Sequence, residues 1–276
     1  MKTVPGFLRT KTVKSAPVLA MSATATTAEI EELKTILGLR PGNTVVLRSD
    51  PVQTQFNFVK VRRPANIYGG FGLENSAGDL QPGLVQTMDR LFLDIYVEKV
   101  MKGEEVKKSI WVFRKEDDIA DIYDSLCERL PDQAANPLTC CFVMNHSGIG
   151  PVTAQSYRDR RGEINLYLTT SVMLLGLDLT NIDIVGMVRP LNMCHYIIQA
   201  AGRGGRNMGT GKRRKVLFYM LYNNNDIASN VPGLSSEVRD FCETKMCLKV
   251  FLKKYFGSTS PTSSEQSWCC SNCYAG

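Results

Sequence analysis

The sequence predicts an α/β fold in which helices cover both faces of a parallel sheet. Short apolar runs recur along the chain, and most are apolar throughout rather than at every second residue, which is typical of strands buried on both faces. Segments with helical periodicity separate several of these runs, as in strand–helix–strand units. The chain has 276 residues, 43% of them hydrophobic and 22% charged, so it is long enough for one or two compact units.

The apolar runs give the expected strands. Each is rich in β-branched, aromatic or other large apolar residues and is short, as strands usually are. In chain order they are PVLAMSA (17–23), TVVLR (44–48), FNFVKV (56–61), SIWVF (109–113), CCFVMN (140–145), INLYLTT (164–170), IDIVGMV (182–188) and KVLFYML (215–221).

Three helices are expected between these strands. Thr26 and Glu29 have the spacing of a capping box, so a helix begins after Thr26, and Ile30, Leu33, Ile36 and Leu37 fall on one of its faces. The second helix is marked by Leu84, Met88, Leu91, Phe92, Ile95 and Tyr96, and the third by Ile119, Ile122, Tyr123, Leu126 and Leu130.

Glycine content and cysteine content divide the chain. GGFGLENSAGDLQPG, residues 69 to 83, is rich in glycine and has no periodicity, which is typical of a linker. After about residue 228 the pattern changes to helix with cysteines. We therefore expect an N-terminal piece over 1–66, a linker over 67–83, a main unit over 84–228 and a small C-terminal unit over 229–276.

The formal charge of +6 is mildly basic, and the positive residues form short clusters such as Arg62-Arg63 and Lys212 to Lys215. Such clusters either bind a polyanion or form an ordinary solvated surface. No apolar run approaches the roughly 20 residues of a membrane span, and the first residues do not resemble a signal peptide. The expectation is an intracellular protein that does not act on a membrane.

Nine cysteines are present, and Cys242, Cys247, Cys269, Cys270 and Cys273 lie close to the C-terminal end. In a reducing compartment this clustering favours a metal site over a disulfide framework; the alternative is a set of reduced, metal-free thiols. His146 and His195 stand alone, and an isolated histidine is more often a satisfied surface or core residue than a ligand, so neither is assigned a role.

The stretch QAAGRGGRNMGTGKRRK (199–215) contains two candidate nucleotide motifs. GTGK lacks the G-x-x-x-x-G-K-[ST] spacing of a phosphate loop and precedes an expected strand, so it predicts a basic turn. QAAGRGGR follows a helical HYIIQAA segment and places Arg203 and Arg206 three apart on one face. Two such arginines suit a polyphosphate, although a glycine-rich helix end is the alternative.

QAAGRGGR resembles the sixth motif of superfamily 2 helicases, Q-x-x-G-R-x-G-R, and three other motifs of that superfamily occur in order. AMSATAT (20–26) resembles the third motif, with the flanking residues typical of RecQ-like DNA helicases. SIWVF followed by Arg114 resembles the fourth motif, and TTSVMLLGLD (169–178) the fifth, with Leu174 where the family usually has a glycine. The four span about 190 residues. The resemblance implies a RecA-like lobe.

CLKVFLKKYFG, which begins at Cys247, resembles the RecQ zinc-binding segment, and SWCCSNC then supplies Cys269, Cys270 and Cys273. Four thiolates can close a tetrahedral structural zinc site. In the family's C-x-x-C-x-x-C spacing, Ser267 would be the second ligand of the group, and serine is a poor ligand. Either Cys269 substitutes for it or Cys242 reaches in.

The resemblance also implies roles for individual residues. Arg206 would be the arginine finger toward the γ-phosphate of ATP, Arg203 a second phosphate contact, and Gln199 would orient the motif. Gly176, Asp178, Gly202 and Gly205 would lie near the nucleotide, and Thr169 and Thr170 near the nucleic-acid backbone. Ser22 and Thr24 would couple the two sites, although a strand end that caps the next helix is the alternative.

In this family ATP and Mg²⁺ lie between two RecA-like lobes, and the first lobe supplies the phosphate loop and the acidic box. Neither motif occurs in this sequence, so residues 1–66 resemble only the end of a first lobe. The resemblance implies the C-terminal part of a 3′–5′ DNA helicase that acts on single-stranded or partly duplex DNA in repair, inactive as an ATPase alone, and nuclear if the source is eukaryotic. The alternatives are a non-catalytic nucleic-acid-binding or regulatory module and an inactive remnant.

Overall fold

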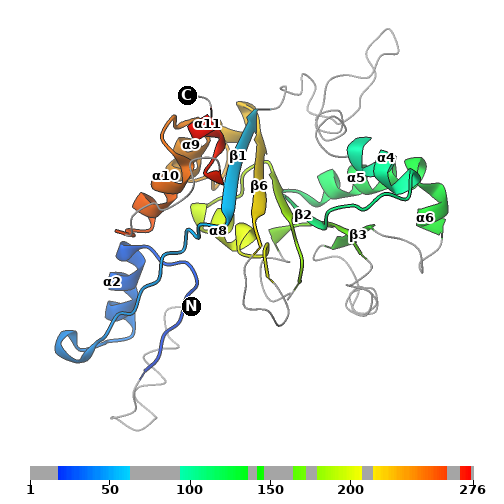
Figure 1. Ribbon diagram of the computed structural model, residues 1–276. Coiled ribbons are helices and arrows are strands. Elements are labelled where there is room, and N and C mark those ends of the chain that lie inside the picture. Colours follow the sequence, from blue (N-terminus) through cyan, green and yellow to red (C-terminus); the bar gives the residue numbers. More distant parts are fainter. Residues whose placement is uncertain are drawn as a thin grey trace.

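Six of the expected strands form one parallel sheet in the computed structural model, which describes residues 18–62, 94–135, 142–145, 164–171, 179–206, 214–259 and 268–274. The sheet order is β1-β6-β5-β2-β4-β3 (Figure 1). This confirms the predicted α/β class with a parallel sheet. The strands are β1 (Phe56–Arg62), β2 (Ser109–Phe113), β3 (Phe142–Asn145), β4 (Leu166–Thr169), β5 (Ile184–Val188) and β6 (Val216–Tyr222).

The helices cover both faces of this sheet, as predicted. One buried cluster joins the strands to helix residues such as Ile197, Phe241 and Leu252, and a second joins them to Tyr96 and Ile119. The helices are α2 (Thr27–Ile36), α4 (Asp94–Met101), α5 (Glu116–Arg129), α6 (Pro131–Ala135), α8 (Cys194–Ala201), α9 (Ser236–Glu243), α10 (Leu248–Tyr255) and α11 (Ser271–Tyr274), with short 3-10 turns η1 (Pro41–Asn43) and η4 (Asn225–Ile227).

Helix α2 begins where its capping box predicts. The Thr26 hydroxyl accepts a hydrogen bond from the Glu29 backbone N–H, and the Glu29 carboxylate accepts one from the Thr26 backbone N–H at 2.7 Å. The reciprocal bonds satisfy two donors that the first turn of a helix otherwise leaves free. The predicted apolar face is present, but none of the residues of α2 is buried.

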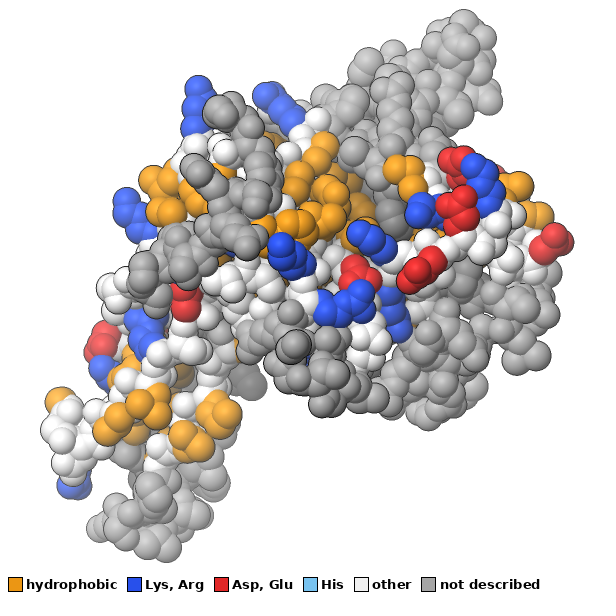
Figure 2. Space-filling model, viewed as in Figure 1, with side chains coloured by type: hydrophobic (Ala, Val, Ile, Leu, Met, Phe, Trp, Pro, Cys, Tyr) orange, Lys and Arg blue, Asp and Glu red, His pale blue; other side chains and the backbone are white. Residues whose placement is uncertain are grey.

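Two expected strands are wrong. Residues 18–23 and 44–48 are not strands, and no described strand pairs with them. Their side chains are not covered either: Leu19 is 83% exposed and Leu47 is 92% exposed. Figure 2 shows apolar side chains gathered on the surface around α2 and the segment that follows it. A strand needs a neighbour for its backbone hydrogen bonds, so local apolar character alone does not make one.

Strand β1 belongs to the segment that we assign to the end of a first lobe, yet it forms the edge of the main sheet. It pairs with β6 in parallel over its whole length, from Phe56 opposite Val216 to Arg62 opposite Tyr222. The domain boundaries themselves remain predictions. The linker and the start of the helix expected from Leu84 lie outside the described residues, as does the GTGK turn. Within the described ranges, no helix is both long and apolar enough to cross a membrane.

Candidate functional site

The polar site centres on α8, which ends in a glycine-rich turn. Gly205 has φ = +71°, a left-handed conformation that side chains disfavour, and a Cβ there would lie 2.7 Å from the Arg214 carbonyl oxygen. A Cβ on Gly204 would lie 2.5 Å from Val216 Cγ1 on β6. The two glycines therefore allow the turn to lie directly against the sheet and fix the path of the chain toward Arg206.

Arg203 and Arg206 follow α8 rather than lying on it. The helix ends at Ala201, so the expectation that one helix face carries both guanidinium groups is wrong. The backbone of this turn is held firmly: the Gly205 N–H donates to Ile182 O at 2.9 Å, and Arg206 O accepts from the Asn181 N–H at 3.0 Å. The Arg206 side chain is exposed, and its Nε donates to Gly202 O at 2.9 Å.

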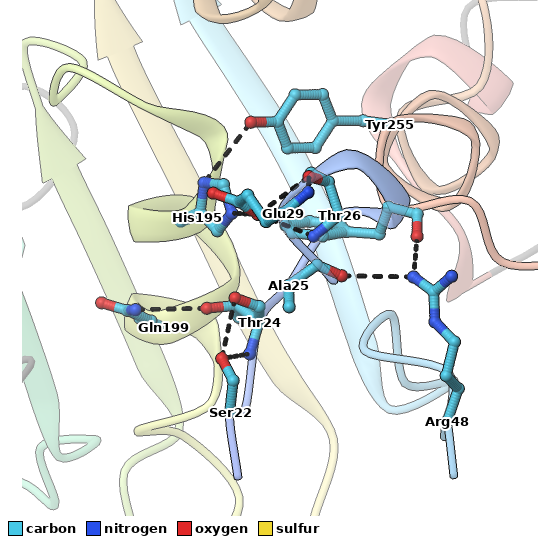
Figure 3. Close-up of polar contacts among 10 residues, drawn as sticks. Ser22, Thr24, Ala25, Thr26, Glu29, Arg48, His195, Gln199 and Tyr255 are labelled. Atoms are coloured by element: carbon cyan, nitrogen blue, oxygen red, sulfur yellow. Dashed lines mark hydrogen bonds and ion pairs between the residues drawn. The ribbon is translucent and has the colours of Figure 1, made fainter. Parts of the chain in front are cut away.

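A hydrogen bond joins α8 to the segment around Ser22. The Gln199 Nε2 donates to Thr24 Oγ1 at 3.2 Å, and the Ser22 Oγ donates to Thr24 O at 3.0 Å (Figure 3). Thr24 is 9% exposed, and Gln199 Oε1 is buried without a hydrogen-bond partner among the described residues. The structure thus brings together three residues from the third and sixth predicted motifs.

A second contact between these segments involves His195, an isolated histidine for which no role was expected. Its Nε2 lies 2.9 Å from the Glu29 carboxylate Oε2, and its Nδ1 lies 3.4 Å from the Tyr255 hydroxyl (Figure 3). His195 is therefore a junction of α2, α8 and α10. One signal could have pointed to it, because His195 precedes Gln199 by four residues and so shares its helix face.

Electrostatics at this junction favour the charged form of Glu29. Burial raises the pKa of Glu29, but hydrogen bonds from the Thr26 backbone and hydroxyl and from His195 outweigh burial, so the pKa lies below its ordinary value. Arg48 adds a further tie: its Nη1 donates to Thr27 Oγ1 at 3.0 Å, and its Nη2 donates to Ala25 O and to Phe256 O. The start of α2 is thereby fixed to the end of α10.

Thr169 and Thr170, which are predicted to lie near the nucleic-acid backbone, are at the end of β4 rather than on α8. Thr169 ends β4 and is fully buried, and its Oγ1 donates to Thr170 O at 3.0 Å, while Thr170 is 9% exposed. Gly176 and Asp178 lie outside the described residues. Gly202 caps α8, with its N–H donating to Ile198 O at 2.8 Å.

Four cysteines form a compact cluster beside the edge of the sheet. The Sγ atoms of Cys247, Cys269, Cys270 and Cys273 all lie within 4.8 Å of one another. Three of these separations are 3.4 Å, 3.9 Å and 3.5 Å. A zinc ion with Zn–S bonds of about 2.3 Å requires sulfur atoms about 3.8 Å apart. The cluster therefore fits a tetrahedral zinc ion, with Cys269 among the ligands.

Cys242 is not part of that cluster. Its side chain is fully buried, and burial raises the pKa of its thiol to about 12. Its carbonyl oxygen accepts hydrogen bonds from Lys60 Nζ at 2.8 Å and from the Tyr222 hydroxyl at 2.6 Å. Of the two ligand sets that the sequence left open, the structure brings together the set with Cys269.

The cysteine cluster is tied to β1 and to a buried cation. The Phe58 N–H donates to Cys269 O at 3.4 Å, so the cluster continues the edge of the sheet.

Lys249 is 1% exposed, and its Nζ donates to Thr54 O at 3.0 Å and to Trp268 O at 3.2 Å. Burial lowers the pKa of Lys249, and the neighbouring thiols of Cys269, Cys247 and Cys270 oppose that shift. A buried cation at this place would balance thiolate charge.

Comparison with known proteins supports the fold. No family model and no curated protein matches the sequence. A variant of S. cerevisiae Dbp5 bound to RNA and ADP BeF3 is 16% identical, with a TM-score of 0.51 over 90% of this chain and 51% of that chain. M. smegmatis helicase Lhr bound to ssDNA and AMP-PNP is 17% identical (TM-score 0.44, 62% of this chain and 20% of that chain). Helicase MrfA bound to DNA is 16% identical (TM-score 0.43, 59% and 20%).

The likeness to the Dbp5 structure supports a shared fold. This chain spans about half of the Dbp5 structure and a fifth of the Lhr and MrfA structures. Together with the parallel six-stranded sheet and its flanking helices, the comparison supports the fold of a RecA-like lobe.

Proposed function

We propose that this chain is the C-terminal part of a RecQ-like 3′–5′ DNA helicase, which couples ATP hydrolysis to DNA unwinding. The hydrogen bond from Gln199 to Thr24 carries the proposal. Thr24 lies in the motif that resembles the link between nucleotide and nucleic acid, and Gln199 lies in the motif that resembles the arginine finger. Direct contact between them is the geometry that such coupling needs.

The proposed role of this lobe is to stabilise phosphate charge. The Arg206 guanidinium is exposed at the end of a turn whose backbone is held by Gly205 and Asn181, so it is presented on a rigid support. An arginine finger stabilises the charge that develops on a transferring phosphoryl group. Arg203 would make a second phosphate contact, and Gly176 and Asp178 would lie near the nucleotide. ATP and Mg²⁺ would be held by groups of a first lobe, and this sequence contains neither a phosphate loop nor an acidic box.

The cysteine cluster has a structural role in this proposal. Cys247, Cys269, Cys270 and Cys273 would hold Zn²⁺, which would join the start of α10 to α11 and the edge strand β1. A closed four-thiolate site leaves no open position for substrate, so the ion would stabilise the fold rather than take part in catalysis. Action on single-stranded or partly duplex DNA in repair, and nuclear residence in a eukaryotic source, belong to the same proposal.

The competing function is that of a non-catalytic nucleic-acid-binding module. The exposed apolar residues around α2 are compatible with a partner lobe, but they do not distinguish a motor from a binding module. Both functions require affinity for single-stranded DNA. They differ in ATP turnover once a phosphate loop is supplied.

Titration of the isolated chain with labelled single-stranded DNA tests the shared requirement. We expect binding whose affinity falls as a power of the salt concentration, because phosphate contacts release counterions. We also expect no DNA-stimulated ATP hydrolysis by this chain alone, since an arginine finger acts only on a phosphate that other groups hold. Absence of DNA binding at low salt would overturn the proposal.

A further inference from the structure

A pocket of about 680 Å³ lies at the carboxyl ends of β1 and β6, away from the Gln199–Thr24 contact. Its wall includes Lys60 and Arg62 from β1, Tyr222 from β6, and Glu243 and Lys245 from the end of α9 and the residues after it. Ligands of open parallel sheets bind at the carboxyl ends of the strands. The pocket lies on this carboxyl-terminal side of the sheet, over the edge strand β1 and its neighbour β6 rather than where the strand order reverses.

Backbone carbonyl groups beside this pocket already accept hydrogen bonds from side chains that line it. Lys60 Nζ donates to Cys242 O at 2.8 Å and to Thr244 O at 2.7 Å, at the end of α9. Asn272 Nδ2 donates to Thr244 O at 2.8 Å and to Met246 O at 2.7 Å. A helix C-terminus ordinarily repels anions, because its last carbonyl groups are unpaired. Here Lys60 and Asn272 donate hydrogen bonds to carbonyl groups at the end of α9, so the repulsion of an anion is reduced.

The rim of the pocket carries exposed charged groups. Arg62 and Lys245 are exposed cations, and Arg62 Nη2 donates to Asn224 Oδ1, which holds the guanidinium at the rim. Among the described residues, Glu243 is the one acidic side chain that lines the pocket. With Lys60, the described lining has three cations and one carboxylate, so it is net positive and attracts anions.

We propose that this pocket binds the phosphodiester backbone of single-stranded nucleic acid through Arg62 and Lys245. The proposal rests on the nucleic-acid binding of the proposed function and adds a site to it. The volume is that of a site for a small ligand of nucleotide size. The Asn224 amide oxygen already accepts a hydrogen bond from Arg62, and the Glu243 carboxylate repels an anion, so Arg62 and Lys245 are the side chains that would hold the phosphates.

The position of the pocket favours a single strand of nucleic acid over a free anion as its ligand. Arg114 follows β2 and Thr170 follows β4 at the same edge of the sheet, because all the strands are parallel. Thr170 is a predicted backbone contact. A single strand of nucleic acid that crosses this edge of the sheet from β4 toward β1 would reach Arg62 and Lys245 beside β1.

The test is the affinity of the full chain for an oligothymidylate, measured by fluorescence anisotropy over a range of salt. Each lost phosphate contact on a single strand makes the negative slope of log affinity against log salt shallower by about 0.7, and it lowers the affinity about fivefold at about 0.1 M salt. For Arg62→Ala/Lys245→Ala we expect a slope that is shallower by about 1.4. Glu243→Gln is expected to bind about twofold or more tightly, because it removes the repelling carboxylate.

Lys34→Ala/Lys102→Ala is the matched control, since it removes the same charge from two lysines that do not line the pocket and that pair with Glu31 on α2 and Glu98 on α4. It should leave the slope near that of the wild type. The assignment of the pocket, but not the proposed function, would be wrong if both double variants changed the salt dependence of DNA affinity equally. It would also be wrong if Arg62→Ala/Lys245→Ala left that affinity unchanged while the wild type binds DNA. A wild type that does not bind DNA would overturn the proposed function as well. Binding of inorganic phosphate to Arg62 and Lys245, without any effect on DNA affinity, would identify a free-phosphate site instead.

Discussion

Gln199 donates a hydrogen bond to Thr24 at 3.2 Å across 175 positions of sequence. The bond links the segment before α2 to the helix that leads to Arg206, and it lies beside the contact of His195 with Glu29. Two polar links between the same segments hold the start of α2 against α8. The proposed coupling between nucleotide and nucleic acid depends on this arrangement.

Removal of the Thr24 hydroxyl should weaken the link. In Thr24→Val the Gln199 Nε2 loses its acceptor, and Gln199 Oε1 is already buried without a hydrogen-bond partner among the described residues. Loss of a partner for a buried polar group costs about 1–3 kcal/mol. We expect urea denaturation to show a free energy of unfolding lower by about 1–2 kcal/mol. Thr24→Ser keeps the hydroxyl and serves as the control. Equal stability of the two variants would contradict the role of the bond.

Glu29 should make stability depend on acid pH. Its folded pKa lies below the ordinary value of 4.5, so its ionised form is favoured by folding. This contribution is present above the unfolded pKa and is lost as pH falls through the folded pKa. We expect Glu29→Gln to be less stable than the wild type at neutral pH, with a difference that narrows below about pH 4.5. A difference in the free energy of unfolding that stays constant down to about pH 3 would argue against this assignment.

Metal content tests the cysteine cluster. We expect about one zinc ion in each purified chain, measured by mass spectrometry, because four thiolates complete a structural zinc site. Cys270→Ser should lose most of the bound metal and lower the melting temperature, and chelation should have the same effect on the wild type. Cys127→Ser changes a cysteine of α5 outside the cluster and should keep the metal. Equal metal content in the two variants would rule out the assigned ligands.

Gly204 should not tolerate a side chain. A Cβ at this position would lie 2.5 Å from Val216 Cγ1 and 3.3 Å from Val185 Cγ2, on two strands of the sheet. Overpacking of this kind typically costs about 1–3 kcal/mol, and we expect Gly204→Ala to be destabilised by that amount. Gly42→Ala is the control, since nothing lies within 4 Å of the added Cβ. A Gly204→Ala variant as stable as the control would show that the turn does not lie against the sheet as described.

Sequence patterns predicted the helices and strands that depend on residues close together in the chain. The capping box at Thr26 and the fully apolar run of β2 both give the observed element, because the signal lies within a few residues. The run at 44–48 has the same apolar character, but it lacks a partner strand among the described residues. Strand formation there depends on residues distant in sequence, which a local pattern does not contain.

Only those parts of the candidate site that belong to a recognisable sequence motif could be predicted. Cysteine spacing predicted the cluster, but the choice of Cys269 over Cys242 required the fold, which places the carbonyl group of Cys242 against Lys60. The spacing of His195 from Gln199 could have pointed to His195 itself, but not to its partners Glu29 and Tyr255, which come from two other helices. The exposed position of Arg206 beyond the end of α8 depends on the close packing of Gly204 on β6.

Hydrolysis of ATP by a two-lobe protein tests whether Arg206 acts as an arginine finger. The protein would carry a first RecA-like lobe of a RecQ-like helicase, with its phosphate loop and acidic box, joined ahead of this chain. We predict DNA-stimulated hydrolysis that falls by about 10³–10⁵ in Arg206→Ala, while the affinity for single-stranded DNA is unchanged. Arg206→Lys, which keeps the charge but loses the bidentate guanidinium, should recover little. Hydrolysis that Arg206→Ala leaves intact would contradict the assigned arginine finger, and DNA binding without any hydrolysis would favour the non-catalytic module.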